Sequence, residues 1–163
     1  MRLCIPFMLV AILGAAAPTA DDPPKDDAVC TLVLDGGSIE KLSLESDRGE
    51  EKIFIKPSES VALEPGRYRV AEIAIEGGYT YSGLFRTVSQ WFTLAPGGQH
   101  RLRAGSPLTS RVEVERRGRI LELNYKLQDA AGRSYRSNDR SNPPSFIVTK
   151  DGKQIGGGTF DYG

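Results

Sequence analysis

Side chains that could perform catalysis are few and poorly grouped in this sequence of 163 residues. The single histidine, His100, lies in an alternating stretch, where a histidine is more often a surface residue of a strand than a general base. The segment "KPSES" at 56–60 lacks the Ser-x-x-Lys spacing of acylating enzymes, and the sequence contains no Gly-x-Ser-x-Gly elbow. A carboxylate-pair hydrolase is an unfavoured alternative, because strand alternation alone explains Glu72, Glu76 and Glu113. The sequence therefore predicts a protein that is not an enzyme and has no catalytic residues, metal site or cofactor.

An aromatic segment suggests one kind of binding chemistry. Residues 76–92 contain Tyr79, Tyr81, Phe85, Trp91 and Phe92. Aromatic rings with polar edges can stack on the faces of sugars, and a glycine-flanked loop can present them. Tyr79 and Tyr81 alternate with polar residues and are the surface candidates, whereas Phe85 and Trp91 are expected to fill the core. A carbohydrate-binding module that uses the aromatic residues of this segment is therefore one alternative function.

An arginine-bearing segment suggests a second kind of binding chemistry. Residues 129–145 predict a polar loop that is longer than compact domains usually carry without a functional reason. Arg133 and Arg136 flank Tyr135, and arginine forks suit a carboxylate or sulfate on a glycan or protein partner. These three residues are the predicted binding residues, together with Tyr79 and Tyr81. A mobile connector is the alternative interpretation of the loop.

The elements that must position these residues are strands. Short apolar stretches with a period of two occur at 29–34, 39–44, 52–56, 67–76, 99–103, 111–116, 120–128 and 145–149, and glycine-, proline- or aspartate-rich turns separate them. This spacing predicts an all-β fold, an antiparallel β-sandwich of the immunoglobulin-like or prealbumin-like kind. We expect a single sandwich domain at 29–163. The predicted buried residues are Leu34, Ile55, Val70, Ile73, Trp91, Val112, Leu121, Leu123, Tyr125 and Val148.

Two hairpins can be placed from the sequence alone. In "VEVERRGRILELNYKL" at 112–127, valine and leucine side chains share one face, and Gly118 supplies the positive φ of a three- or four-residue loop. In "FIVTKDGKQIG" at 146–156, the pair Asp151-Gly152 favours a tight primed turn. A further strand at 158–162 is expected to lie at an edge of the sheet, where its backbone could recruit a peptide.

The segment "LEPGRYRV" at 63–70 predicts a turn that leads into a strand. Pro65 and Gly66 suit the second and third positions of a type II turn, with Gly66 in the left-handed conformation. The apolar set then changes parity, because Tyr68 and Val70 share one face while the following apolar residues are Ala71, Ile73 and Ile75. This slip predicts a β-bulge near 70–71, or alternatively a strand that is packed on both faces.

The same segment carries a family resemblance. The string Leu63-Glu64-Pro65-Gly66-Arg67-Tyr68-Arg69-Val70 resembles the L-x-P-G-x-Y-x-V signature of carboxypeptidase-regulatory-like and related prealbumin-like domains. A partial repeat at 92–102 has His100 where a tyrosine could stand. The resemblance implies a secreted sandwich of seven or eight strands that generally has no catalytic residues of its own. It implies nothing about a ligand.

The N-terminal segment predicts export. Residues 1–20 combine a basic start, an apolar run and small residues, which is the layout of a secretory signal peptide. The run is shorter than the ~20 apolar residues of a membrane span, so no stable span is expected after cleavage, and an uncleaved membrane anchor is the alternative. Residues 21–28, "DDPPKDDA", predict a flexible acidic linker, because they contain no large apolar side chain. The protein is expected to be secreted or periplasmic.

The charge balance and the cysteine content restrict the classes of partner that the protein is expected to bind. The 21 basic and 21 acidic residues balance, which disfavours nucleic-acid binding. Cys4 would leave with the signal peptide, and Cys30 is expected to be buried as a small apolar side chain, with pairing to another chain as the alternative. The sequence therefore favours an exported, non-catalytic module for protein interaction or structural support in the cell envelope. Its expected partner is another secreted or envelope protein, or a glycan.

Overall fold

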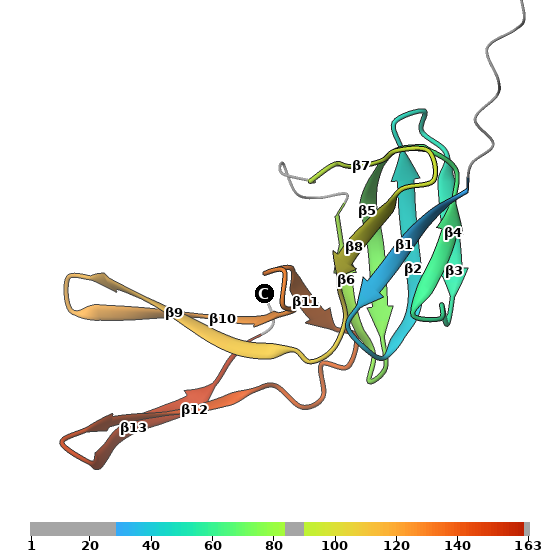
Figure 1. Cartoon of the computed structure of the whole chain (residues 1–163). Helices are drawn as coiled ribbons and strands as arrows, with labels where there is room; N and C mark the ends of the chain where they lie inside the picture. The colour runs from blue at the N-terminus through green and yellow to red at the C-terminus, as the bar shows by residue number, and fades with distance from the viewer. Residues whose placement is uncertain (1–28, 84–89, 162–163) are drawn as a thin grey trace, which may run out of the picture.

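The computed structural model describes residues 29–83 and 90–161. The predicted signal peptide at 1–20 and linker at 21–28 lie outside the described residues, as do Phe85 and Tyr162. All regular structure in the described ranges is β (Figure 1), which confirms the predicted all-β class. These ranges contain no helix that is long and apolar enough to cross a membrane.

Two facing sheets form a β-sandwich (Figure 1). The first sheet has the order β4 (Ser60–Leu63), β1 (Cys30–Asp35), β8 (Gln99–Arg103). The second begins with β3 (Glu51–Ile55), β2 (Ile39–Ser46), β5 (Gly66–Ile75) and β6 (Tyr79–Ser82), and β7 (Phe92–Leu94) pairs with the first residues of β5. The described pairs are antiparallel except β1 with β8, which run parallel. The predicted antiparallel sandwich is therefore confirmed, with one parallel pair added.

Alternating apolar side chains from both sheets fill the space between them. Leu32 of β1, Leu42 and Leu44 of β2 and Ile73 of β5 have no exposed surface. Burial of each such side chain contributes about 1.5–3 kcal/mol, so this layer is the main source of stability. Cys30 is buried in the same layer, as predicted, and its thiol donates a hydrogen bond of 3.0 Å to the Ala95 carbonyl.

The predicted bulge lies in β5. Ser43 pairs with Glu72 and the next residue, Leu44, pairs with Val70, so Ala71 is the additional residue on β5. The insertion keeps Val70 and Ile73 on the buried side despite their odd separation. The change of parity in the sequence therefore predicted this irregularity correctly.

The segment at 63–70 forms a corner that Tyr68 closes. The buried Tyr68 hydroxyl donates a hydrogen bond of 3.0 Å to the carbonyl of Glu64, four residues earlier, which is the geometry of a tyrosine corner. Burial raises the pKa of this hydroxyl, so it remains a neutral donor. The predicted left-handed conformation of Gly66 is wrong: Gly66 is extended as the first residue of β5, and the Tyr68 ring packs against it. The hydrogen bond from Tyr68 to the Glu64 carbonyl contributes about 1 kcal/mol to the stability of the fold.

Two hairpins extend away from the sandwich (Figure 1). The second sheet continues from β6 through β11 (Ser134–Ser137) and β10 (Ile120–Gln128) to β9 (Thr109–Arg117). The strands β12 (Ser145–Lys150) and β13 (Lys153–Thr159) form a separate two-stranded sheet. The sequence analysis missed the short strands β4, β6, β7 and β11. Of the further strand expected at 158–162, the described residues have only 158 and 159 in a strand, as the end of β13.

The hairpin turns differ from one another in how well the sequence predicted them. Arg117 pairs with Ile120, so only Gly118 and Arg119 form the β9–β10 turn, and the predicted three- or four-residue loop is wrong. Gly118 has the expected positive φ of 65°. Asp151 and Gly152 have φ values of 50° and 75°, which confirms the predicted primed turn between β12 and β13.

Several predicted core residues lie at the surface instead. Leu34, Val70 and Ile73 are buried as predicted, but Ile55 is 68% exposed and Trp91 is 37% exposed. β3 is the outer strand of its sheet and turns Phe54 toward the core, so the alternation places Ile55 outward. Phe92 packs against the core. Because adjacent residues of an extended chain point to opposite sides, Trp91 faces outward. The guanidinium groups of Arg67 and Arg69 lie 5.6 and 5.1 Å from the Trp91 ring.

The predicted core residues of the hairpins are also not fully buried. Val112 and Leu121 are 44% and 56% exposed, and Leu123, Tyr125 and Val148 are half-buried. The alternation of these strands was identified correctly, but the sandwich does not cover their apolar side. This uncovered side becomes the main candidate for a functional surface.

Candidate interaction surface

The two segments that the sequence singled out for binding meet in one buried cluster. Tyr81 of β6 and Tyr135 of β11 are 6% and 5% exposed, and their ring centroids are 6.1 Å apart. The Arg133 guanidinium lies 5.9 Å from the centre of the Tyr81 ring. β11 adds to the sheet beside β6, and this pairing brings residues more than fifty positions apart into contact.

Asp129 holds this cluster together. Its carboxylate has no exposed side-chain surface and accepts hydrogen bonds from the backbone N–H groups of Ala131 and Arg133 at 3.0 and 2.9 Å. Its other oxygen accepts from Arg133 Nη1 at 2.9 Å and from the Tyr135 hydroxyl at 3.2 Å. The first two bonds close the turn between β10 and β11, and the other two bind that turn to the cluster.

The cluster fixes the root of the β9–β10 hairpin against the sandwich. Arg133 Nη1 donates to the Arg103 carbonyl at the end of β8, and the Gly105 N–H donates to the Tyr135 hydroxyl at 3.3 Å. Burial, followed by the Asp129 charge, raises the pKa of Tyr135, so its hydroxyl stays protonated and can both donate and accept. These groups are used within the fold, and their arrangement serves to orient the hairpin.

The predicted binding residues must be reassigned accordingly. Tyr81 is buried and Tyr79 is half-buried against the core, so the prediction that these two rings are displayed together on the surface is wrong. Tyr135 is buried and Arg133 is ion-paired, so the predicted grouping of Arg133, Tyr135 and Arg136 as exposed contacts is also wrong. Arg136 alone is exposed. The predicted seventeen-residue loop contains β11 and is not a simple connector.

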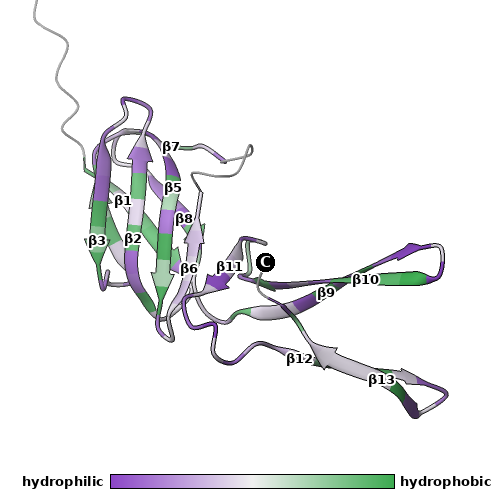
Figure 2. Ribbon diagram, turned by 180° about the vertical axis from the view of Figure 1, so that it is seen from behind, coloured by the Kyte–Doolittle hydropathy of each residue, from purple (hydrophilic) through white to green (hydrophobic). Residues whose placement is uncertain are grey.

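The β9–β10 hairpin has one apolar and one charged face. Residues directly opposite each other in the nine-pair register share a face, so Val112 lies beside Tyr125 and Val114 beside Leu123. The same face carries Leu121 and Leu127. Val114 is 59% exposed and Leu121 is 56% exposed, so apolar side chains face solvent here. Figure 2 shows hydrophobic residues in green along β10, outside the sandwich.

Ion pairs stabilise the opposite face of this hairpin. The Lys126 ammonium lies 2.5 Å from Glu113 Oε2 and, by this hydrogen bond, lowers the pKa of the Glu113 carboxyl. Arg117 lies 3.2 Å from Glu122 and 3.4 Å from Glu115. These exposed pairs contribute little stability each, but they keep the charged face in water and leave the apolar face as the side available for contact.

The second hairpin touches the first through three aromatic rings. Phe160, which follows β13, lies 5.3 Å from Tyr125 and 4.9 Å from Phe146, measured between ring centroids. Beyond these rings, Ile147 and Ile155 of the second hairpin are 67% and 64% exposed. Two adjacent hairpins therefore display apolar residues outside the packed core, which is the feature that marks interaction sites on soluble proteins.

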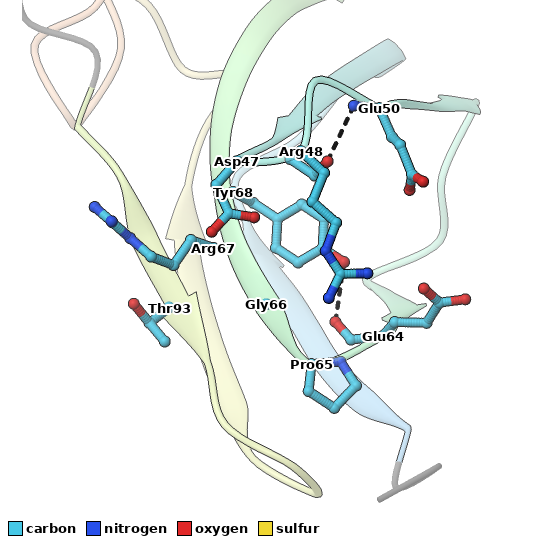
Figure 3. Close-up of a pocket in the computed structure, with 10 residues that line it drawn as sticks. Asp47, Arg48, Glu50, Glu64, Pro65, Gly66, Arg67, Tyr68 and Thr93 are labelled. Atoms are coloured by element: carbon cyan, nitrogen blue, oxygen red, sulfur yellow. Dashed lines mark hydrogen bonds between the residues drawn. The ribbon is translucent and has the colours of Figure 1, made fainter. Parts of the chain in front are cut away.

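A pocket of about 300 Å³ lies at the first residues of β5, beside the tyrosine corner (Figure 3). Asp47, Arg48, Glu50, Glu64 and Arg67 contribute its charged lining. Two hydrogen bonds at its wall are internal to the fold, from Tyr68 to the Glu64 carbonyl and from the Glu50 N–H to Ser46. Its charges are mixed and its walls are mostly exposed side chains, so the hairpins are the stronger candidate surface.

The remaining observations add no other type of site. Within residues 29–83 and 90–161, no group of three or more histidine, cysteine or acidic residues is placed to hold a metal ion. Comparison with family models, with curated proteins and with solved structures finds no match to this chain. Asp129 is the structural residue that the sequence analysis missed. An aspartate followed by small residues and Gly132 signals a turn, but does not show that its carboxylate is buried.

Proposed function

We propose that this protein is an exported, non-catalytic β-sandwich module that binds another secreted or envelope protein through its projecting hairpins. The observation that carries the proposal is the exposed apolar face of β9–β10, with Val114 59% and Leu121 56% exposed. A two-stranded ribbon gains little from such side chains while they face water, whereas contact with a partner buries them. The resemblance of 63–70 to regulatory-like domains of secreted proteins supports the same proposal.

A crosslinking experiment tests the binding surface. A photo-crosslinking amino acid at position 114 or 121 is expected to capture a discrete protein in cells that export the chain. The matched control is position 58, an exposed residue between β3 and β4 on the sandwich. Equal capture from 58 and 114, or none from either hairpin position, would contradict this assignment. Mass spectrometry of the captured species identifies the partner.

Export is tested separately. The basic start and apolar run of 1–20 support cleavage between Thr19 and Asp22, which leaves a mature chain without Cys4. We expect the intact mass of the protein recovered from the periplasm or medium to correspond to such a cut. Recovery of a chain that retains Met1 or Arg2 is the result that argues against export by this route.

A further inference from the structure

We infer that β9 pairs with β9 of a second copy of this chain, antiparallel and about a two-fold axis at Val112. This inference rests on the proposed function, because it names a partner for the same hairpin. Within the described part of the chain, β9 is the last strand of its sheet and pairs only with β10. Its other edge therefore offers backbone donors and acceptors to an incoming strand.

The edge of β9 has the regularity that strand addition requires. Its nine residues, Thr109–Arg117, pair one to one with β10 without a register shift, and the strand contains no proline. Bulges, prolines and very short strands prevent edge pairing, and β9 has none of them. Charged side chains also discourage it, but those of β9 are of both signs, so opposite charges can face each other across a two-fold axis. Every residue of the strand is exposed.

The two-residue turn determines which backbone groups point outward. Arg117 and Ile120 close this turn as a hydrogen-bonded pair, and bonded pairs alternate with non-bonded pairs along an antiparallel ladder. Ser110, Val112 and Val114 therefore direct their N–H and C=O groups away from β10. A second β9 can bond to the same three residues when Val112 lies opposite Val112 of the second copy.

Charge selects this register. With the axis at Val112, each Arg111 lies opposite Glu113 of the other copy, in a non-bonded pair whose side chains are close. An axis at Glu113 would oppose each Arg111 with Glu115 but would also place the two Glu113 carboxylates opposite each other, and an axis at Val114 would oppose Glu113 with Glu115. Like charges in directly opposite positions are destabilising. Both alternatives are therefore weaker than the register centred on Val112.

Arg111 gives an independent reason to expect an acidic partner. Within its own hairpin it lies opposite Lys126, another cation, and it has no ion pair closer than 4 Å among the described residues. The Lys126 ammonium is already bonded to Glu113. A carboxylate supplied by the second copy on the open side of Arg111 would offset this cross-strand repulsion.

Sedimentation analysis of the full chain tests the pairing. We expect a concentration-dependent dimer and, for Arg111→Glu, a dissociation constant raised at least about tenfold, because two opposite-charge pairs become like-charge pairs. The monomer should keep its fold, since the introduced carboxylate faces Lys126. Arg111→Glu with Glu113→Arg is expected to restore dimerisation. The matched control is Arg119→Glu, which makes the same change of charge in the turn, outside the paired residues, and should dimerise like the wild type.

Cysteine trapping tests the register itself. Under mild oxidation Val112→Cys is expected to form a covalent dimer, because a bonded antiparallel pair places the two Cα atoms about 5.5 Å apart. Val114→Cys should not, since its two Cα atoms lie roughly 14 Å apart in this register. The wild-type mature chain, which keeps Cys30 after the proposed cleavage, gives the background. A monomeric wild type, or equal trapping at 112 and 114, overturns the inference. Capture of a different protein from position 114 would leave the proposed function intact in either case.

Discussion

Replacing Asp129 with alanine is expected to lower the free energy of unfolding by about 3 kcal/mol. The carboxylate is fully buried and accepts four hydrogen bonds, two from the β10–β11 turn, one from Arg133 and one from Tyr135. Its removal leaves a largely buried guanidinium without its ion-pair partner, which is the costly way to break such a pair. Urea denaturation followed by tryptophan fluorescence and circular dichroism measures the loss.

The control for this variant is Asp139→Ala. Asp139 is exposed, and within the described ranges its carboxylate accepts hydrogen bonds only from Ser141 in its own turn, so its replacement should change stability by no more than about 0.5 kcal/mol. Hydrogen exchange should also show that Asp129→Ala loses protection in β10 and β11 before β1 and β2. Equal losses for the two variants, or uniform loss of protection, would mean that Asp129 does not anchor the hairpin.

Leu44→Ala is expected to destabilise the protein by about 4 kcal/mol, because it removes a fully buried side chain between the two sheets. Leu123→Ala is the matched comparison: the same substitution on the hairpin should cost only about 1 kcal/mol, since this leucine is half-buried. Thermal and urea unfolding measure both differences. A loss for Leu123→Ala as large as that for Leu44→Ala would show that the hairpin face is packed within the molecule.

This contrast also shows what alternation in the sequence can predict. Alternation placed Val112 and Val114 on the same face as Leu123, and it predicted a bulge near 70–71, because both depend on residues adjacent in the chain. A period of two identifies the apolar side of a strand but does not show whether another element covers it. The hairpin was therefore predicted as core although the sandwich does not reach it.

The candidate site was harder to predict because its determinants are distant in the sequence. Tyr81 lies between two polar residues, Thr80 and Ser82, and this pattern is the same for a displayed ring and a buried one. Its burial depends on Tyr135, which β11 brings beside β6. Both strands are only four residues long, so neither gives a periodic signal strong enough to identify. Local turns were recognised more readily, as at Asp151-Gly152.

Because β11 is short, a small rotation at this strand can move the far end of the β9–β10 hairpin by several ångströms. β11 contributes two residue pairs to β6 and two to β10, and the nine-residue ribbon extends from that joint. Since nine residues of strand span roughly 30 Å, a rotation of about 10° at β11 would displace the distant turn by about 5 Å. The direction in which the β9–β10 hairpin projects is thus determined by a few groups around Asp129, far from the residues that would contact a partner.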